Sequence, residues 1–133
     1  MKSVIAVLAA LLLLSSPAPA REYAVCGPQG GISMKLTLPE GFNTTSDSCH
    51  MVILMHGIFS SKDYPPMPRI AKALAKEGIA SIRFDFDGHG RSEGQMVDMT
   101  IANELADALA VCNYATSLPF VTGISHVATG QHH

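Results

Sequence analysis

Residues 51–92 read MVILMHGIFSSKDYPPMPRIAKALAKEGIASIRFDFDGHGRS, and their hydrophobic period changes twice. The first five residues are continuously apolar, as in a strand buried on both faces. A helical stripe follows, made of Met67, Ile70, Ala71 and Leu74. Pro68 near its first turn and Gly78 just past its end are helix start and stop signals. Because residues 79–86 again read as a strand, the segment is a β-α-β unit with parallel strands and a right-handed crossover.

The segments on either side extend this unit. Residues 22–27 and 32–38 read as two strands joined by the turn PQGG, which predicts an antiparallel hairpin. Thr100 is the expected N-cap of a second helix that runs to about Thr116. Its expected buried stripe consists of Ile101, Leu105, Ala108, Leu109 and Cys112. Ile124 is expected to begin a third parallel strand. The fold class is therefore α/β, with a hairpin leading into a mostly parallel sheet flanked by helices.

Length and composition indicate one globular domain preceded by an export signal. The 133 residues are 47% hydrophobic and 15% charged. Lys2 precedes the apolar run of residues 4–14, and the small-residue exit SSPAPA ends at Ala20. This pattern is typical of a secretory signal peptide (residues 1–20) cleaved after Ala20, leaving a domain of residues 21–133. A transmembrane anchor is the competing interpretation, but the run is short for a bilayer and a cleavage site follows it.

The charge of the chain argues against two classes of binding partner, and its cysteines offer one candidate disulfide. Removal of Lys2 with the signal changes the net charge from −2 to −3, and no basic patch indicates nucleic acid or an anionic membrane surface. We therefore expect a secreted or periplasmic protein without a stable membrane anchor. In that oxidising setting Cys26 and Cys49 are a candidate disulfide, although the odd cysteine count weakens the pairing. Cys112, at helical spacing from other apolar residues, is expected to be buried.

The order of an apolar strand, His56-Gly57, a helix, and then RFDFDGHGRS at residues 83–92 resembles the first half of an α/β-hydrolase. More closely, it is similar to bacterial feruloyl or cinnamoyl esterases and the serine aminopeptidase-like group. The resemblance runs from about Cys26 to Ile124, so residues 125–133 are expected to be a divergent tail. It implies a serine hydrolase of carboxylic esters, with a small-molecule ester as substrate of the complete enzyme and no cofactor.

Acyl transfer needs donors for the oxyanion that develops on the carbonyl, and backbone N–H groups in a tight loop provide them. Gly57 allows a close backbone approach just past the end of a strand, where α/β sheets bind ligands. The resemblance places one oxyanion donor at the backbone N–H of Ile58, supported by His56 and Gly57. His56 is then a residue that braces the loop, since the triad order in these enzymes is Ser, acid, His.

The loop after the second strand of the unit has the same structural interpretation. The resemblance gives a structural role to Asp87, Gly88, His89, Gly90 and Ser92. Asp85 and Asp87 precede any nucleophile and so come too early to be the triad acid. Arg83 and Asp85 lie two residues apart, and we expect a local charge pair between them.

No catalytic residue can be assigned. In the family the next strand ends in G-x-S-x-G, whereas residues 123–133 read GISHVATGQHH. Ser125 is expected at the start of its strand instead of its end, and it is not taken as the nucleophile. The later acid and histidine are missing as well. No metal site is expected, because the spacing of His126, His132 and His133 matches no closed zinc pattern.

Two hypotheses follow. In the first, the chain is the N-terminal part of an exported ester hydrolase and is inactive alone. In the second, it is a short non-catalytic product that serves as a binding or assembly partner. The resemblance also places residues 51–55 beside a strand that the chain lacks, so we expect an unpaired apolar edge there. The two helices are expected on opposite faces of the sheet.

Overall fold

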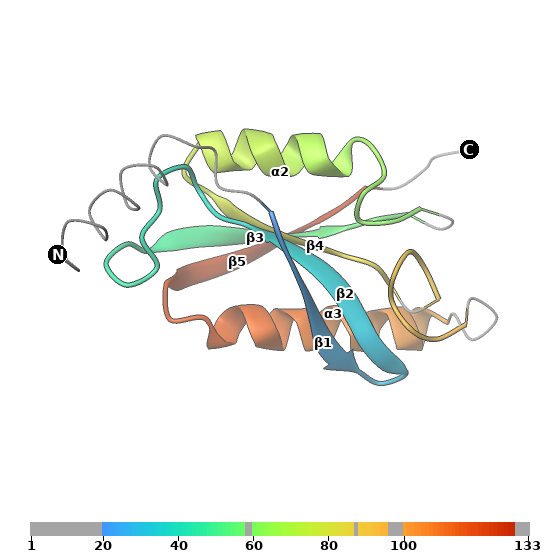
Figure 1. The fold of residues 1–133 in the computed structure, drawn as a ribbon. Coiled ribbons are helices and arrows are strands. Elements are labelled where there is room, and N and C mark those ends of the chain that lie inside the picture. Colours follow the sequence, from blue (N-terminus) through green and yellow to red (C-terminus); the bar gives the residue numbers. More distant parts are fainter. Residues whose placement is uncertain (1–19, 58–59, 87, 96–99, 130–133) are drawn as a thin grey trace, which may run out of the picture.

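The computed structural model describes residues 20–57, 60–86, 88–95 and 100–129. These form one sheet with a helix on each face (Figure 1). The strands are β1 (Arg21–Gly27), β2 (Gly30–Thr37), β3 (Cys49–Met55), β4 (Ala80–Phe84) and β5 (Val121–Ala128). The helices are α2 (Met67–Lys76) and α3 (Ile101–Ser117). The spatial order is β1-β2-β4-β3-β5, so the α/β class predicted from the sequence is confirmed.

Strand pairing confirms the predicted hairpin and β-α-β unit. β1 and β2 pair antiparallel, and Gly30, the first residue of β2 after the turn, has a φ of 123°, a backbone conformation that favours glycine. β3 and β4 are parallel and α2 connects them. β2 pairs antiparallel with β4 and so joins the hairpin to the parallel part of the sheet.

The third parallel strand differs from the prediction in where it begins and in what it covers. β5 begins at Val121, not at Ile124, and it continues to Ala128 through much of the expected tail. It pairs in parallel with β3 along the whole of that strand. The prediction of an unpaired edge beside residues 51–55 is therefore wrong, because residues 121–128 supply a strand that pairs with this edge.

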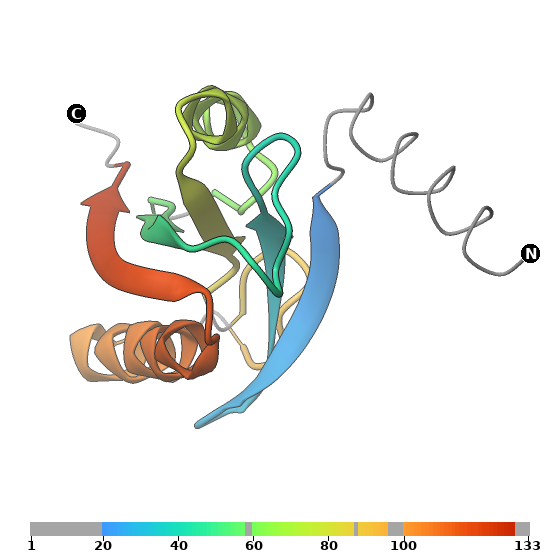
Figure 2. The same ribbon diagram turned by 90° about the vertical axis from the view of Figure 1, so that its left-hand side faces the viewer.

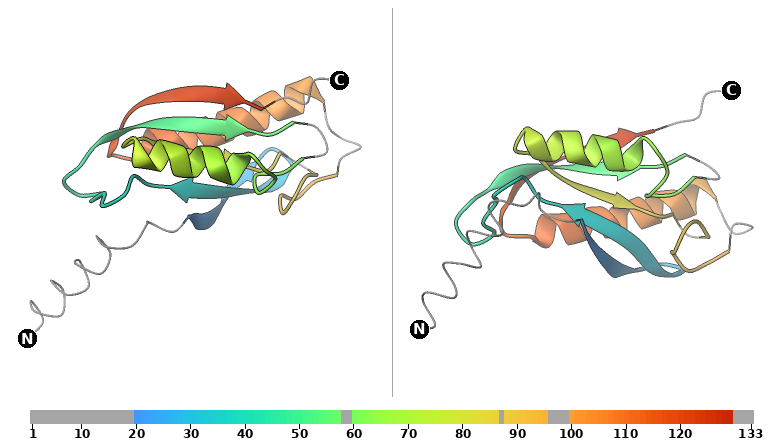
Figure 3. Two further views of the ribbon diagram at one scale, coloured as in Figure 1. Left: turned by 90° about the horizontal axis from the view of Figure 1, so that it is seen from above. Right: turned by 45° about the horizontal axis from the view of Figure 1, so that its top comes forward.

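The core is divided by the sheet. Met51 and Ile53 of β3 face α3, whereas Val52 and Leu54 face α2, as the alternation of a strand requires. The continuously apolar β3 is thus covered on both faces, as predicted. Figure 2 and Figure 3 show the two helices on opposite faces from other directions. The larger cluster, beneath β2, β4 and β3, contains Ile32, Met34, Leu36, Ile82, Phe84, Val111 and Ala115.

The buried face of α3 is not the predicted one. The helix starts as predicted, since the Thr100 hydroxyl accepts a hydrogen bond from the Asn103 N–H at 3.1 Å. However, Val111 and Ala115 are buried, while Leu105 and Leu109 are 60% and 54% exposed. Apolar residues occur on every side of this alanine-rich helix, so its hydrophobic periodicity fits more than one buried face. The prediction chose the face with the bulky leucines, whereas the face with smaller side chains packs against the sheet.

Candidate functional site

The candidate site is the edge of the sheet where β3 and β4 end. Met55 and Phe84 are register partners in the parallel pair, so the segments that follow them leave the sheet side by side. In open α/β sheets, ligands bind at this carboxyl edge. The segment after β3 begins with His56-Gly57, and the segment after β4 begins with Asp85.

His56 connects these two segments. Its Nε2 accepts a hydrogen bond from the Phe86 N–H at 3.1 Å, and its Nδ1 therefore carries the proton that is donated to the Gly57 carbonyl at 2.7 Å. The ring is buried and lies edge-on to Phe86. Both ring nitrogens are engaged in holding the loops, which is the geometry expected of a bracing residue.

Burial gives His56 a measurable pH signature. Burial lowers the pKa of His56, partly opposed by its hydrogen bond to the Gly57 carbonyl. The unfolded chain therefore binds more protons near and below about pH 6.5, so stability is full above that pH and falls as the pH drops. We expect the free energy of unfolding to decrease from pH 7.5 to pH 5.5 in urea denaturation.

The matched variant for this prediction is His56→Gln, whose amide keeps one donor and one acceptor without titrating. Its free energy of unfolding should vary less between the two pH values than that of the parent chain. An equal pH dependence in both proteins would show that His56 does not titrate in this window.

The residue expected to supply the oxyanion donor lies outside the described part of the chain. Ile58 and Phe59 fall there, as does Asp87 of the second loop. Gly57 is described, and its carbonyl also accepts a hydrogen bond from the Ser60 N–H at 3.2 Å. The assignment of the donor to Ile58 stays a prediction.

A buried ion pair holds the loop after β3 against the loop after β4. Asp85 and Lys62 are both almost wholly inaccessible, and Lys62 Nζ lies 2.8 Å from Asp85 Oδ2. Two backbone N–H groups also donate hydrogen bonds to the Asp85 carboxylate, that of Lys62 to Oδ1 at 2.7 Å and that of Arg91 to Oδ2 at 3.0 Å. A buried charge is tolerated only with such partners. The pair therefore fixes the positions of both loops.

Lys62 was not expected at the site from the sequence. It occurs in the polar stretch SSKD, where a lysine is ordinarily solvated. Its ammonium also lies 3.5 Å from a carboxylate oxygen of Glu22 and 3.5 Å from one of Asp63. Its partners come from β1, the loop after β4 and its own loop, so no local pattern could have identified it.

The predicted charge pair between Arg83 and Asp85 is wrong. Arg83 instead donates from Nε to the Lys62 carbonyl at 2.9 Å and from Nη1 to the Thr37 hydroxyl at 3.3 Å. The prediction assumed strand alternation through residue 85, but β4 ends at Phe84. Asp85 is thus free of the strand and turns to Lys62.

The loop of residues 88–94 is anchored to β2. Residues 90–94 read GRSEG, a literal match to G-x-S-x-G, but they follow β4 and not β5. The Ser92 hydroxyl accepts a hydrogen bond from the Ser33 N–H at 2.8 Å and donates one to the Asp85 carbonyl. Its hydroxyl is engaged with the backbone, in keeping with a structural role. Gly88 and Gly90 have positive φ angles, and His89 is buried with its ring centroid 5.1 Å from that of His56.

Ser125 lies in the middle of β5, so its expected position at the start of the strand is wrong. Its hydroxyl is 2.7 Å from His50 Nε2 on β3, at an exposed position. His126 Nε2 lies 2.9 Å from the Sγ of Cys112, which is only partly buried. Burial raises the pKa of the Cys112 thiol, so this pair is not an activated thiolate.

The candidate disulfide cysteines and the C-terminal histidines do not form a site in the described part of the chain. Cys26 is exposed on β1 and Cys49 is buried on β3, two strands separated by β2 and β4, and both thiols are free. The structure does not bring them together. His132 and His133 lie outside the described residues, and within the described ones no three metal-binding side chains cluster. No helix in the described ranges is long and apolar enough to span a membrane.

Known proteins share both the sequence pattern and the fold. A family model described as serine aminopeptidase, S33, matches residues 46–119, more than half of the chain. An uncharacterized 31.7 kDa Escherichia coli protein from the traX-finO intergenic region is 31% identical over 85 residues, which are 64% of this chain and 28% of that protein. The chain thus spans less than a third of this curated relative.

Solved structures agree. Est1E from Butyrivibrio proteoclasticus, determined with bound ferulic acid, superposes with a TM-score of 0.75 at 27% identity over 80% of this chain and 41% of its own. A putative hydrolase from Agrobacterium vitis gives a TM-score of 0.63 at 28% identity, over 72% of this chain and 36% of its own. An esterase from Pyrococcus furiosus, 22% identical with a TM-score of 0.68, covers 86% of this chain and 41% of its own and shares the fold. With its strand order and its His56-Gly57 segment, the chain belongs to the serine aminopeptidase S33 family of α/β-hydrolases.

Proposed function

We propose that the chain forms the N-terminal, oxyanion-hole part of an exported serine hydrolase that cleaves carboxylic esters. The observation that carries this proposal is the His56-Gly57 segment at the carboxyl end of β3, in which His56 binds the Gly57 carbonyl through Nδ1 and the Phe86 N–H after β4 through Nε2. A donor for an oxyanion must be fixed before the charge develops, and a segment held in this way meets that requirement.

The proposed donor is the backbone N–H of Ile58, the residue after this segment. The hydrogen bond from the Ser60 N–H to the Gly57 carbonyl and the buried Lys62–Asp85 pair hold the residues on either side of it. Preorganised donors of this kind lower the barrier because they need no rearrangement in the transition state. The proposed substrates are esters of aromatic acids, since Est1E, which is similar in fold and sequence, was solved with ferulic acid.

The 133 residues alone are proposed to be inactive. The two serines with motif-like surroundings, Ser92 and Ser125, have hydroxyls bonded to the backbone and to an exposed His50 respectively. Neither serine follows the end of β5, where the family's strained turn exposes its nucleophile. The nucleophile, acid and histidine are proposed to come from the portion of the fold that these residues do not represent.

The experiment is a chimera in which residues 21–128 replace the matching first half of Est1E. Hydrolysis of methyl ferulate should be retained, and Ile58→Pro, which removes the N–H, should lower kcat about 100- to 1,000-fold. Ile58→Ala keeps the N–H and is the matched control, expected to lower kcat far less. Circular dichroism checks that each chimera is folded.

The result that contradicts the donor assignment is a folded Ile58→Pro chimera as active as the Ile58→Ala chimera. The 133-residue chain itself should not hydrolyse p-nitrophenyl acetate above the buffer rate. Turnover by this chain that disappears in Ser92→Ala or Ser125→Ala would instead place a nucleophile on one of those serines.

A further inference from the structure

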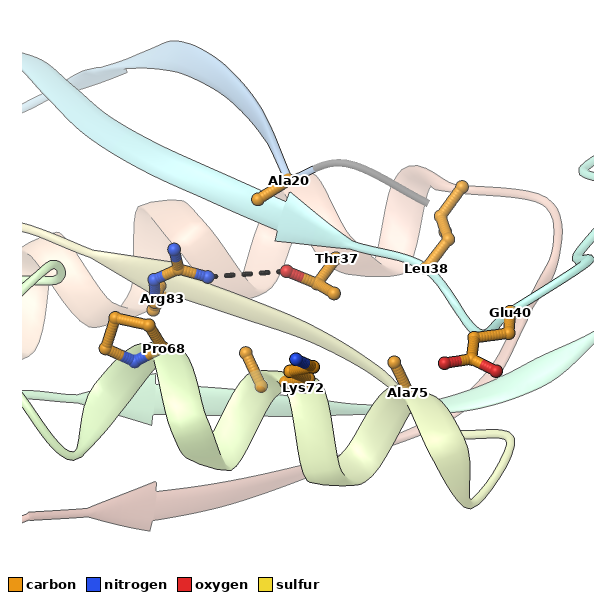
Figure 4. Close-up of a pocket in the computed structure, with 9 residues that line it drawn as sticks. Ala20, Thr37, Leu38, Glu40, Pro68, Lys72, Ala75 and Arg83 are labelled. Atoms are coloured by element: carbon orange, nitrogen blue, oxygen red, sulfur yellow. Dashed lines mark hydrogen bonds between the residues drawn. The ribbon is translucent and has the colours of Figure 1, made fainter. Parts of the chain in front are cut away.

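A groove with a volume of about 180 Å³ lies between α2 and the end of β2, on the face of the sheet opposite α3 (Figure 4). Ala71 and Ala75 of α2 form one wall, and Leu38 after β2 contributes to the other. Figure 4 shows Arg83 and Pro68 at one end and Ala75 and Glu40 at the other. The groove has an apolar body and a cationic end. It is separate from the carboxyl edge that holds His56.

Arg83 can bind an anion in this groove. The Arg83 residue is 5% exposed, and a buried charge is stabilised by an anionic partner. Its recorded partners among the described residues are the Lys62 carbonyl, the Thr37 hydroxyl and the Asp63 carboxylate. A guanidinium carries five N–H donors, so donors remain for a ligand.

The neighbouring charges favour one negative group at this end. Asp63 is 2.6 Å from Lys35, 3.5 Å from Lys62 and 3.7 Å from Arg83, so Arg83 is the most distant of its three cations. Lys72 on α2 also lines the groove, as does Glu40 at the far end. A carboxylate near Arg83 is therefore attracted, and a second carboxylate near Glu40 is repelled.

We propose that this groove binds a small monocarboxylate with a short apolar body, whose carboxylate lies at Arg83 and whose body lies along Ala71 and Ala75. The groove is slightly larger than a cavity of about 150 Å³, which accommodates benzene. Along α2, Pro68 and Ala75 are seven residues apart, about 10 Å at the helical rise. Hexanoate matches both dimensions.

Calorimetric titration of the purified 133-residue chain, which keeps the groove residue Ala20, with hexanoate tests the proposal. Hexanoate should bind at least 10-fold more tightly than each of three comparison ligands. 1-Hexanol lacks the charge, and inorganic phosphate lacks the apolar body. Adipate places a second charge near Glu40. Equal affinity for hexanoate and hexanol, for hexanoate and adipate, or for hexanoate and phosphate would overturn it.

Two variants locate the binding. Ala75→Leu fills the groove and should weaken hexanoate binding at least 10-fold, whereas Ala73→Leu, at an exposed position of the same helix, should not change it. Lys72→Glu changes only an exposed side chain and should weaken binding at least 5-fold, against Lys76→Glu as the control. Binding that survives both Ala75→Leu and Lys72→Glu would place hexanoate elsewhere. If Ala75→Leu does not fold, the Lys72→Glu result decides.

Discussion

Replacement of Asp85 by Asn is expected to lower the free energy of unfolding by about 3–5 kcal/mol, because it leaves the Lys62 ammonium buried without its counter-charge. The side chains of Asp85 and Lys62 are 0% and 1% exposed, so water cannot take over the interaction. Urea denaturation followed by circular dichroism measures the change as a lower midpoint at unchanged slope.

The matched control is Arg91→Gln, which breaks a surface ion pair, because the Arg91 side chain is 75% exposed and lies 3.2 Å from Glu22. Exposed pairs contribute little, so this variant should lose no more than about 1 kcal/mol. Equal losses in the two variants would show that the Lys62–Asp85 pair does not stabilise the fold beyond a surface ion pair.

Gly90→Ala is the second substitution with a large expected effect. Gly90 has a φ of 49°, and a Cβ there would overlap the Asp85 carboxylate. The left-handed backbone alone costs an alanine about 1–2 kcal/mol. Displacing Asp85 from Lys62 adds part of the cost of breaking that pair, so we expect a total loss of about 3 kcal/mol or more.

Gly78→Ala separates the two causes. Gly78 has a φ of 78°, yet nothing lies within 4 Å of a Cβ placed there, so only the backbone cost applies. Thermal or urea unfolding should show this variant about 1–2 kcal/mol less stable than the parent chain. If Gly90→Ala loses no more than Gly78→Ala, the close approach of Gly90 to Asp85 does not constrain the loop.

The elements around α2 could be predicted because local signals agreed. An apolar run, a helical stripe, and Pro and Gly at the helix ends all point to the same β-α-β unit, and the observed α2 contains the whole predicted stripe. His56 and Gly57 were identified through a resemblance, since neither residue is distinctive by itself.

The features that could not be predicted depend on contacts distant in sequence. Lys62 is buried because it pairs with Asp85, which lies 23 residues later in the sequence. The hydrophobic periodicity of a sequence gives no information about a contact of this kind. β5 is a strand because β3 offers it a backbone edge, although most of its own side chains are exposed. For α3, several apolar stripes were available, and packing against the sheet selected the one with small side chains.

The two faces of β4 differ in chemistry, and this difference has an evolutionary consequence. Ile82 and Phe84 belong to the apolar cluster beneath α3, whereas Arg83 points to the ionic contacts on the other face. Ile82 and Phe84 can drift independently among apolar residues of similar volume, as well-packed cores allow. A change at Asp85 is tolerated only with a matching change at Lys62, so related lineages should alter these two positions together or keep both.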